Sequence, residues 1–409
     1  MRLPLPLLRR LGLDRPELRA WAMYDWANSA YVTVIIAAVF PVYFSTVAAA
    51  ELSPAAASGR FTLTTSIAMA IVAVVSPLLG AIADRAPIKK RMILVFTLLG
   101  ASATAALALV ERGDWVLGAI LFAVGNICVT ASFVAYDALL PLLARDDELD
   151  RVSAAGYAMG YIGGGLLLAF DDLLIQKHTL FGFADKADAT RAAFVTVAVW
   201  WIVFAIPLLR RVPEPPVTPR PARGNLVRAT FRDVATTFRS LRRYRQATLM
   251  LVAFLLYNDG IGTILRVATT YGAEIGLDTG TMITALLIVQ FIGIPFTFLF
   301  GGLAGKIGTR PAIFLALGVY AVVSVLGYFM TTSLHFFLLA MLVGIAQGGA
   351  QALSRSLFAS LIPRQRAGEF FGLFAVFDKF AGIFGPLLFA ATVTLLGSSR
   401  PAILSLISV

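Results

Sequence analysis

The sequence predicts an all-α membrane protein built from two six-helix bundles related by a pseudo-two-fold axis. Of its 409 residues, 59% are hydrophobic and 14% are charged, and the mean hydropathy is +0.83. This composition lies outside the range of soluble globular domains. The apolar runs are long enough to cross the ~30 Å of hydrocarbon in a bilayer. They form two sets that share local motifs, and one long polar interval separates the sets.

The apolar runs define the expected spans and domains. We place them at 20–48, 60–83, 91–111, 114–141, 152–175, 191–210, 246–273, 280–303, 311–331, 334–362 and 368–397. A last run, from Pro401 to Val409, is too short to cross a bilayer at ~1.5 Å per residue. We therefore expect a truncated twelfth helix. The predicted domains are an N-terminal bundle at 1–210, a linker at 211–245 and a C-terminal bundle at 246–409.

The linker begins with several prolines, which favour extended backbone. From Asn225 onward, apolar residues recur at helical spacing among arginines, at Val227, Phe231, Val234, Phe238 and Leu241. This pattern predicts an amphipathic helix on the anionic surface of the membrane. A helix that docks on a partner protein is the alternative.

The distribution of basic residues predicts the orientation. Most of the 34 Lys and Arg lie in the N-terminus and in alternate loops, which is the positive-inside pattern. We expect a multi-pass protein of the bacterial inner membrane with a cytoplasmic N-terminus. This placement also explains the net charge of +11 without a nucleic-acid partner.

Several function classes lack their sequence signals. The sequence holds one cysteine, Cys128, and its two histidines, His178 and His335, are too far apart for a metal-ligand motif. It contains no G-x-x-x-x-G-K-[ST] nucleotide loop. We therefore expect no cofactor, no metal, no enzyme activity and no ATP-driven step.

A polar stretch opens the first span. In the string from Trp21 to Tyr31, the residues Tyr24, Asn28 and Tyr31 share one helical face, and Asp25 flanks it. A charge inside a span is costly unless it faces a wet cavity or a partner. These four residues are therefore candidates for substrate binding or coupling.

The two sets of spans repeat local motifs. Tyr24-Asp25 in the first span corresponds to Tyr257-Asn258-Asp259 in the seventh, and the segment Gly80–Arg85 corresponds to Gly301–Lys306. Six-plus-six repeats with a long central loop are typical of transporters in which two bundles rock about a site at the membrane midplane.

Two strings carry a family resemblance. Gly80-x-x-x-Asp84-Arg85 with trailing basics, including Arg91, resembles the signature of the loop between helices 2 and 3 in the major facilitator superfamily, although Pro87 replaces the usual glycine. The string Tyr24-Asp-Trp-Ala-Asn-Ser-Ala-Tyr31 resembles the first helix of the Atg22-like, or UMF1, branch. The resemblance implies a twelve-helix facilitator fold, and for eukaryotic members it implies export of amino acids from the vacuole.

The motif residues have two readings. Asp84, with Arg85 and Arg91, would form a gate in which Asp84 accepts charge-assisted hydrogen bonds across the inter-bundle seam in one state. The alternative is a turn whose basic residues only set the topology.

Further polar residues lie inside the spans. Tyr136 and Asp137 lie in span four, and Gln347, Gln351 and Ser354 form a stripe in span ten beside Arg355. This stripe should face the central cavity, or Arg355 should pair with an acid such as Asp137. A static salt bridge between the halves and a ligand contact remain open as readings.

Spans five, seven and eleven complete the candidates. Asn258, Asp259 and Arg266 lie in span seven and Asp378 lies beside Lys379 in span eleven. Asp259 and Arg266 are ~10 Å apart on one face, a spacing that suits either the two ends of a zwitterion or two separate partners. In span five, Gly156, Gly160 and Gly164 should permit close helix packing. The acids near the outer end of that span, Asp171, Asp172, Asp185 and Asp188, are expected to be solvated.

The sequence therefore predicts a monomeric secondary transporter for a small zwitterionic solute, working by rocker-switch alternating access and proton-coupled efflux. One alternative is a lipid or lysolipid-like amphiphile as cargo on the same fold, for which a lateral apolar opening is expected. A second alternative is a non-transporting membrane receptor or enzyme, which would require a polar triad or metal cluster.

Overall fold

A computed structural model describes residues 4–216, 241–274 and 279–381, with isolated positions at 236, 239, 388, 392 and 404. Every regular element in this part of the chain is helical. The helices are α1 (Leu5–Arg10), α2 (Pro16–Ala30), α3 (Phe40–Tyr43), α4 (Pro54–Ala83), α5 (Lys89–Ala106), α6 (Trp115–Leu143), α7 (Leu149–Gln176), α8 (Lys186–Arg211), α10 (Arg245–Glu274), α11 (Thr279–Ile307), α12 (Thr309–Tyr328), α13 (Ser333–Leu361) and α14 (Ala367–Phe380).

Ten helices in the described residues are long and apolar enough to cross a membrane, and they match the first ten predicted spans. The described part of the eleventh span is α14. The rest of that span, the run from Pro401 to Val409 and the predicted amphipathic helix of the linker lie outside the described residues.

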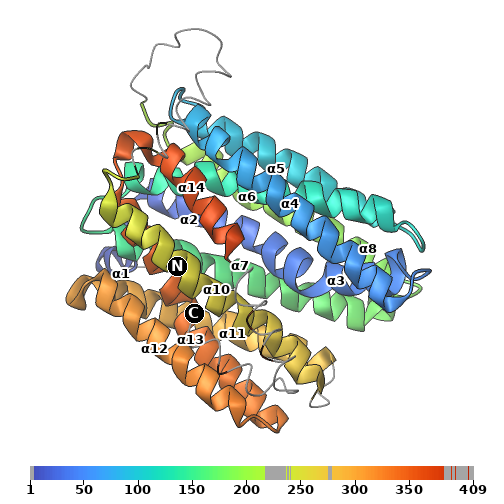
Figure 1. The fold of residues 1–409 in the computed structure, drawn as a ribbon. Helices are drawn as coiled ribbons and strands as arrows, with labels where there is room; N and C mark the ends of the chain where they lie inside the picture. Colours follow the sequence, from blue (N-terminus) through green and yellow to red (C-terminus); the bar gives the residue numbers. More distant parts are fainter. Residues whose placement is uncertain are drawn as a thin grey trace.

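The helices form two groups with a seam between them (Figure 1). In the first group α2 packs on α7 and α8, while α6 packs on α4 and α5. In the second group α13 packs on α11 and α12, and α10 packs on α14. The seam is made where α7 meets α11 and where α4 meets α14, so each bundle contributes two helices to these principal contacts.

The first span is an irregular helix. It runs from Pro16 to Ala48 and includes π-helical segments at Tyr31–Val39 and Phe44–Ala48 on either side of α3. Pro41 lies in α3 and has no N–H group to donate. The wider i→i+5 turns on either side of α3 keep the polar first half and the apolar second half of the span in one continuous helix.

The sequence predicts close helix packing at the glycine stripe of α7, and in the structure the helix that packs there is α2. A Cβ atom at Gly156 would meet Asp25 Oδ2 of α2, and one at Gly164 would meet Thr33 Oγ1 at 2.7 Å and the Ser29 carbonyl oxygen at 3.0 Å. Real Cβ atoms essentially never approach a heavy atom within 3.0 Å. Glycine at these positions is therefore required by the packing of α7 on α2.

We predict that Gly164→Val lowers thermal stability because its side chain forces α7 away from α2. Overpacking of this kind typically costs ~1–3 kcal/mol. Gly302→Val is the control, since a Cβ at Gly302 has no neighbour within 4 Å. The measurement is the unfolding midpoint of each purified variant in detergent, and equal midpoints for the two variants would contradict the packing argument.

Candidate functional site at the seam between the bundles

A buried arginine of the second bundle binds to three residues of the first. Arg355 lies in α13 and is only 2% exposed. Its Nη1 donates to Asp137 Oδ1 at 3.1 Å, its Nη2 to Asp25 Oδ2 at 3.1 Å, and its Nε to Ser153 Oγ at 3.0 Å. We call these four residues the Arg355 cluster. Its two ion pairs link α13 to α2 and α6 across the seam, and the hydrogen bond to Ser153 links α13 to α7.

Aromatic rings enclose the guanidinium. The Arg355 Cζ lies 4.4 Å from the ring centroid of Tyr157, 4.9 Å from that of Trp21 and 5.6 Å from that of Tyr136. Trp21 stacks on Tyr136 with centroids 4.5 Å apart, and the Tyr136 hydroxyl donates to Asp25 Oδ2 at 2.8 Å. Cation–π contacts strengthen when the cation is desolvated, so these rings add to the two ion pairs.

The pairing of Arg355 with Asp137 is confirmed as a contact, and Asp25 joins it. The sequence placed Asp25 on the flank of its helical face, and the structure turns that flank toward the seam. Ser153, Trp21 and Tyr157 were missed. A signal existed for Tyr157, which directly follows Gly156, where close helix packing was expected.

Two other residues of the first span lie inside the first bundle. The Tyr24 hydroxyl hydrogen-bonds Thr97 Oγ1 at 2.9 Å, and the Tyr31 hydroxyl donates to the Phe122 carbonyl at 3.3 Å. Both tyrosines are fully buried. Asn28 is also buried, and its amide has no hydrogen-bond partner among the described residues. The structure thus brings neither tyrosine to the Arg355 cluster.

Asp84 binds across the seam at one end of the bundles. Asp84 Oδ1 accepts from the backbone N–H of Gly368 at 3.0 Å, and Oδ2 accepts from that of Glu369 at 2.8 Å. These N–H groups open α14, where the helix dipole favours a negative charge. Lys89 Nζ donates to Asp84 Oδ1 at 3.0 Å. Burial raises the pKa of Asp84 above its ordinary value, while the Lys89 charge and the two N–H donors oppose this rise.

The contact that the gate prediction requires is therefore present, with a different cation. Lys89 is buried against Asp84, although the sequence offered Arg85 and Arg91. Arg91 is exposed at the start of α5, and Arg85 is half-buried and makes further interactions. The trailing basic run was the signal for Lys89, but spacing alone could not say which of its members turns inward.

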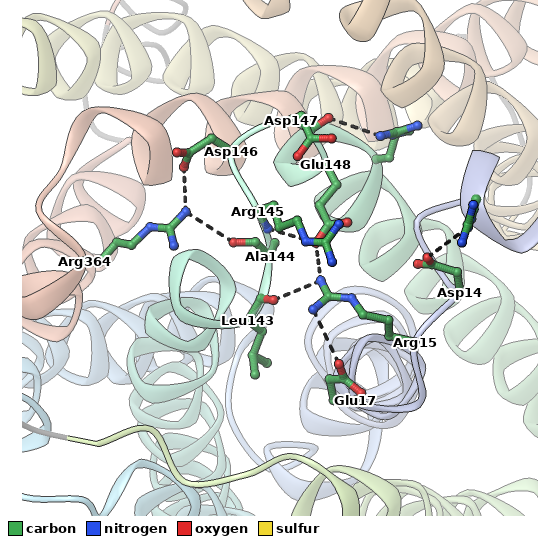
Figure 2. A network of polar contacts seen from close by, with 12 residues as sticks. Asp14, Arg15, Glu17, Leu143, Ala144, Arg145, Asp146, Asp147, Glu148 and Arg364 are labelled. Carbon is green, nitrogen blue, oxygen red and sulfur yellow. Dashed lines mark hydrogen bonds and ion pairs between the residues drawn. The ribbon is translucent and has the colours of Figure 1, made fainter.

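Further polar contacts close the seam at the same end, which we call the basic face (the N-terminus and the loops 84–88, 144–148 and 362–366). Arg364 donates to Asp146 Oδ1 at 2.6 Å and approaches the Ala144 carbonyl at 3.5 Å, as Figure 2 shows. Asp150 accepts from Ser356 Oγ at 2.5 Å and from Thr309 Oγ1 at 2.8 Å. Each pair joins the first bundle to the second.

Arg15 anchors the first span at the basic face. It binds Glu148 and donates to the Leu143 carbonyl at 3.0 Å, and it also pairs with Glu17 at 3.5 Å (Figure 2). These contacts hold the start of α2 against the loop between α6 and α7. That loop also contacts Arg364, so it joins the start of the first span to the contacts that cross the seam.

The other candidate residues of the second bundle lie on α10, α13 and α14. Asn258 Nδ2 donates to Asp378 Oδ1 at 3.2 Å, and Lys379 Nζ lies 3.1 Å from Asp378 Oδ2. Gln351 is half-buried, and the Gln347 Oε1 is buried without a hydrogen-bond partner in the described residues. Asp259 is buried and makes further interactions. Arg266 falls in α10 where side chains are outside the description.

The expectation of a solvated Asp171 is wrong. Asp171 is 0% exposed, and its Oδ1 accepts from Thr196 Oγ1 of α8 at 2.7 Å. The helix α7 continues past it to Gln176 and packs on α8, so the side chain points between two helices. The other three acids of this group, Asp172, Asp185 and Asp188, are exposed or half-buried.

Beside this contact lies an apolar groove between α7 and α8. It has a volume of about 560 Å³ and is lined by Leu166, Leu167, Phe170, Val195, Thr196, Val199, Trp200, Val203 and Phe204. All of these residues belong to α7 and α8, and none of them is a member of the Arg355 cluster. In the described residues no group of three or more His, Cys, Asp or Glu could hold a metal ion.

The arrangement of two helical bundles about this seam is the fold of the major facilitator superfamily. The structure resembles that of the proton:xylose symporter XylE bound to 6-bromo-6-deoxy-D-glucose, with a TM-score of 0.70 and 16% sequence identity over 96% of this chain and 92% of that one. The predicted facilitator fold is therefore confirmed.

The particular family follows from the sequence comparisons. The model of the family described as "Vacuole effluxer Atg22 like" matches residues 53–409, so the chain belongs to the Atg22-like family. It is 36% identical to the uncharacterized MFS-type transporter YxiO of Bacillus subtilis, over 95% of this chain and 91% of that protein. It is 25% identical to autophagy-related protein 22 of Yarrowia lipolytica, over 80% and 69%. Family and fold indicate a transporter, not an enzyme.

We predict that Arg355→Gln strongly destabilises the protein, because it leaves two buried carboxylates without their cation. Breaking a buried pair in this way typically costs ~3–5 kcal/mol. Adding Asp25→Asn and Asp137→Asn should restore most of the loss, since no unpaired charge then remains. The readout is the unfolding midpoint of the single and the triple variant.

Arg364→Gln is the control for this experiment, because its partner Asp146 is exposed and exposed pairs contribute at most ~1 kcal/mol. If the triple variant is no more stable than Arg355→Gln, the loss does not come from unpaired buried charge, and the ion-pair account fails.

Proposed function

We propose that the protein moves a small zwitterionic, amino-acid-like solute across the membrane by rocking residues 1–210 against residues 246–409. The observation that carries this proposal is the Arg355 cluster, a buried ionic contact between the two bundles. Such a charge network is costly, and bundles that never separate would have little reason to retain it. A contact of this kind can be made in one state and broken in the other.

The described contacts support a state that is closed at the basic face. Asp84, Asp150 and Arg364 all bind across the seam there. The Arg355 cluster lies just above them, since Arg355 is six residues from the last residue of α13, or roughly 9 Å along the helix. With the basic face on the cytoplasmic side, as the positive-inside pattern predicts, this state would accept solute from outside the cytoplasm.

The chemistry of the seam suits a zwitterion and proton coupling. Acids and basic groups from both bundles meet there, and an ammonium and a carboxylate group of a cargo would each find an opposite charge. Asp137 is the more exposed acid of the Arg355 cluster, with 15% of its side chain accessible against 7% for Asp25. Protonation of Asp137 would weaken its pair with Arg355, so a proton could loosen the contact that closes the seam.

We place the protein as a monomer in the bacterial inner membrane, with efflux as its direction. The family model is named for vacuole effluxers; export from a vacuole delivers solute to the cytosol, so efflux from a bacterial cell would run in the opposite sense relative to the cytoplasm. The tyrosines Tyr24 and Tyr31 would then stabilise the first bundle during rocking, since they pack inside it.

A lipid-like amphiphile is the second candidate cargo, and the groove between α7 and α8 is the observation that favours it. Its apolar lining and volume of about 560 Å³ would accommodate part of an acyl chain. Against it stands the location of the groove within one bundle, since alternating access requires the cargo to pass along the seam between the two.

The test is transport by the purified protein in proteoliposomes. We predict counterflow of at least one labelled amino acid, stimulated by a pH gradient and lost in Asp25→Asn/Arg355→Ala, because that variant lacks the contact that closes the seam. Asp14→Asn is the control, because the partner of Asp14 among the described residues is Arg9 of the same N-terminal segment. Transport that survives in the double variant would sink the role of these residues, and transport of lysolipid alone would favour the second cargo.

A further inference from the structure

The charged pair Asp378–Lys379 lies at mid-membrane depth on α14. The helix begins at Ala367 on the basic face, so Asp378 is about 17 Å along it, which is near the middle of ~30 Å of hydrocarbon. Asn258, which donates to Asp378, lies near the middle of α10. The three residues therefore form a polar group at the midplane, where rocking transporters hold their cargo.

This pair is accessible, in contrast to the Arg355 cluster. The Asp378 side chain is 37% exposed and that of Lys379 is 25% exposed, whereas Arg355 is 2% exposed. Charges at this depth face a water-filled space or a partner, because hydrocarbon does not solvate them. The helix α14 that carries the pair packs on α4 and α6 of the first bundle, so the pair lies on a helix that borders the seam.

Arg355 is the wrong group to bind a cargo carboxylate in this state. Its Nε, Nη1 and Nη2 all donate to protein oxygens, and three aromatic rings enclose it. A carboxylate would have to displace Asp25 or Asp137 and would leave that acid buried and unpaired. Among the described residues Lys379 pairs with the adjacent Asp378, and its flexible stem allows its ammonium group to turn toward a ligand.

We infer that Asp378, Lys379 and Asn258 form the binding site for the charged head of a zwitterionic cargo, with the cargo ammonium on Asp378 and the cargo carboxylate on Lys379. A zwitterion replaces the Asp378–Lys379 pair by two ion pairs of the same kind, so no charge is left without a partner. The inference rests on the proposed function and assigns the recognition step to residues other than the Arg355 cluster.

The test measures binding by the full-length protein in lipid nanodiscs, without transport. The twenty amino acids are screened by thermal stabilisation, and the tightest binder is compared with its decarboxylated amine and its deaminated acid. Lys379→Gln should weaken binding of the amino acid at least tenfold, from the typical energy of a charged hydrogen bond, and leave the amine unaffected. Asp378→Asn should weaken binding of the amino acid to a similar extent and leave binding of the deaminated acid unaffected.

Lys306→Gln is the matched control, because Lys306 is exposed at the end of α11. If the wild type binds amino acids and both α14 variants retain its affinity and preference, this assignment is overturned while the proposed function stands. If the wild type binds none of the twenty, the proposed function and this assignment both fail. Equal losses for amino acid, amine and acid in either variant would indicate collapse of the site and would also overturn the division of roles.

Discussion

The burial of one guanidinium group governs the arrangement of this protein. Moving an ion out of water costs several kcal/mol even after the protein relaxes, and Arg355 recovers that cost only through contacts from the opposite bundle. Asp25 and Asp137 supply charge and Ser153 supplies a hydroxyl acceptor. These groups reach Arg355 only because Gly156 leaves room for them. The seam is therefore closed when this cluster forms, and it cannot open without solvating the cluster.

The other contacts of the basic face differ from this one in strength. Arg364 and Asp146 are exposed, and such pairs contribute little. Asp84 is buried and uses the N-terminus of α14 together with Lys89, so it joins α4 to α14 more firmly. A closed face with a few strong contacts and several weak ones is suited to a two-state element, because a change at one strong contact shifts the equilibrium of the whole face.

The sequence predicted the helices well because apolar length and helix-breaking residues are local properties. It also predicted the pairing of Arg355 with an acid, since a lone buried cation requires one. It could not predict which face of α2 turns to the seam: helical periodicity fixes the angle between Tyr24 and Asp25 but not the absolute orientation of either. The burial of Asp171 was not predicted for a similar reason. Its partner Thr196 lies on the next helix, and only the packing of α7 on α8 brings the two residues together.

The central claim is that the Arg355 cluster holds the bundles together at the basic face, and a distance between spin labels tests it most directly. Labels at Arg211 of α8 and Lys306 of α11, both exposed ends at that face, report its width in a Cys128→Ser background. Double electron–electron resonance should give one short distance between the two labels in the otherwise native chain. The triple variant with Arg355→Gln, Asp25→Asn and Asp137→Asn should add a longer population. An unchanged distance distribution in that variant would contradict the claim.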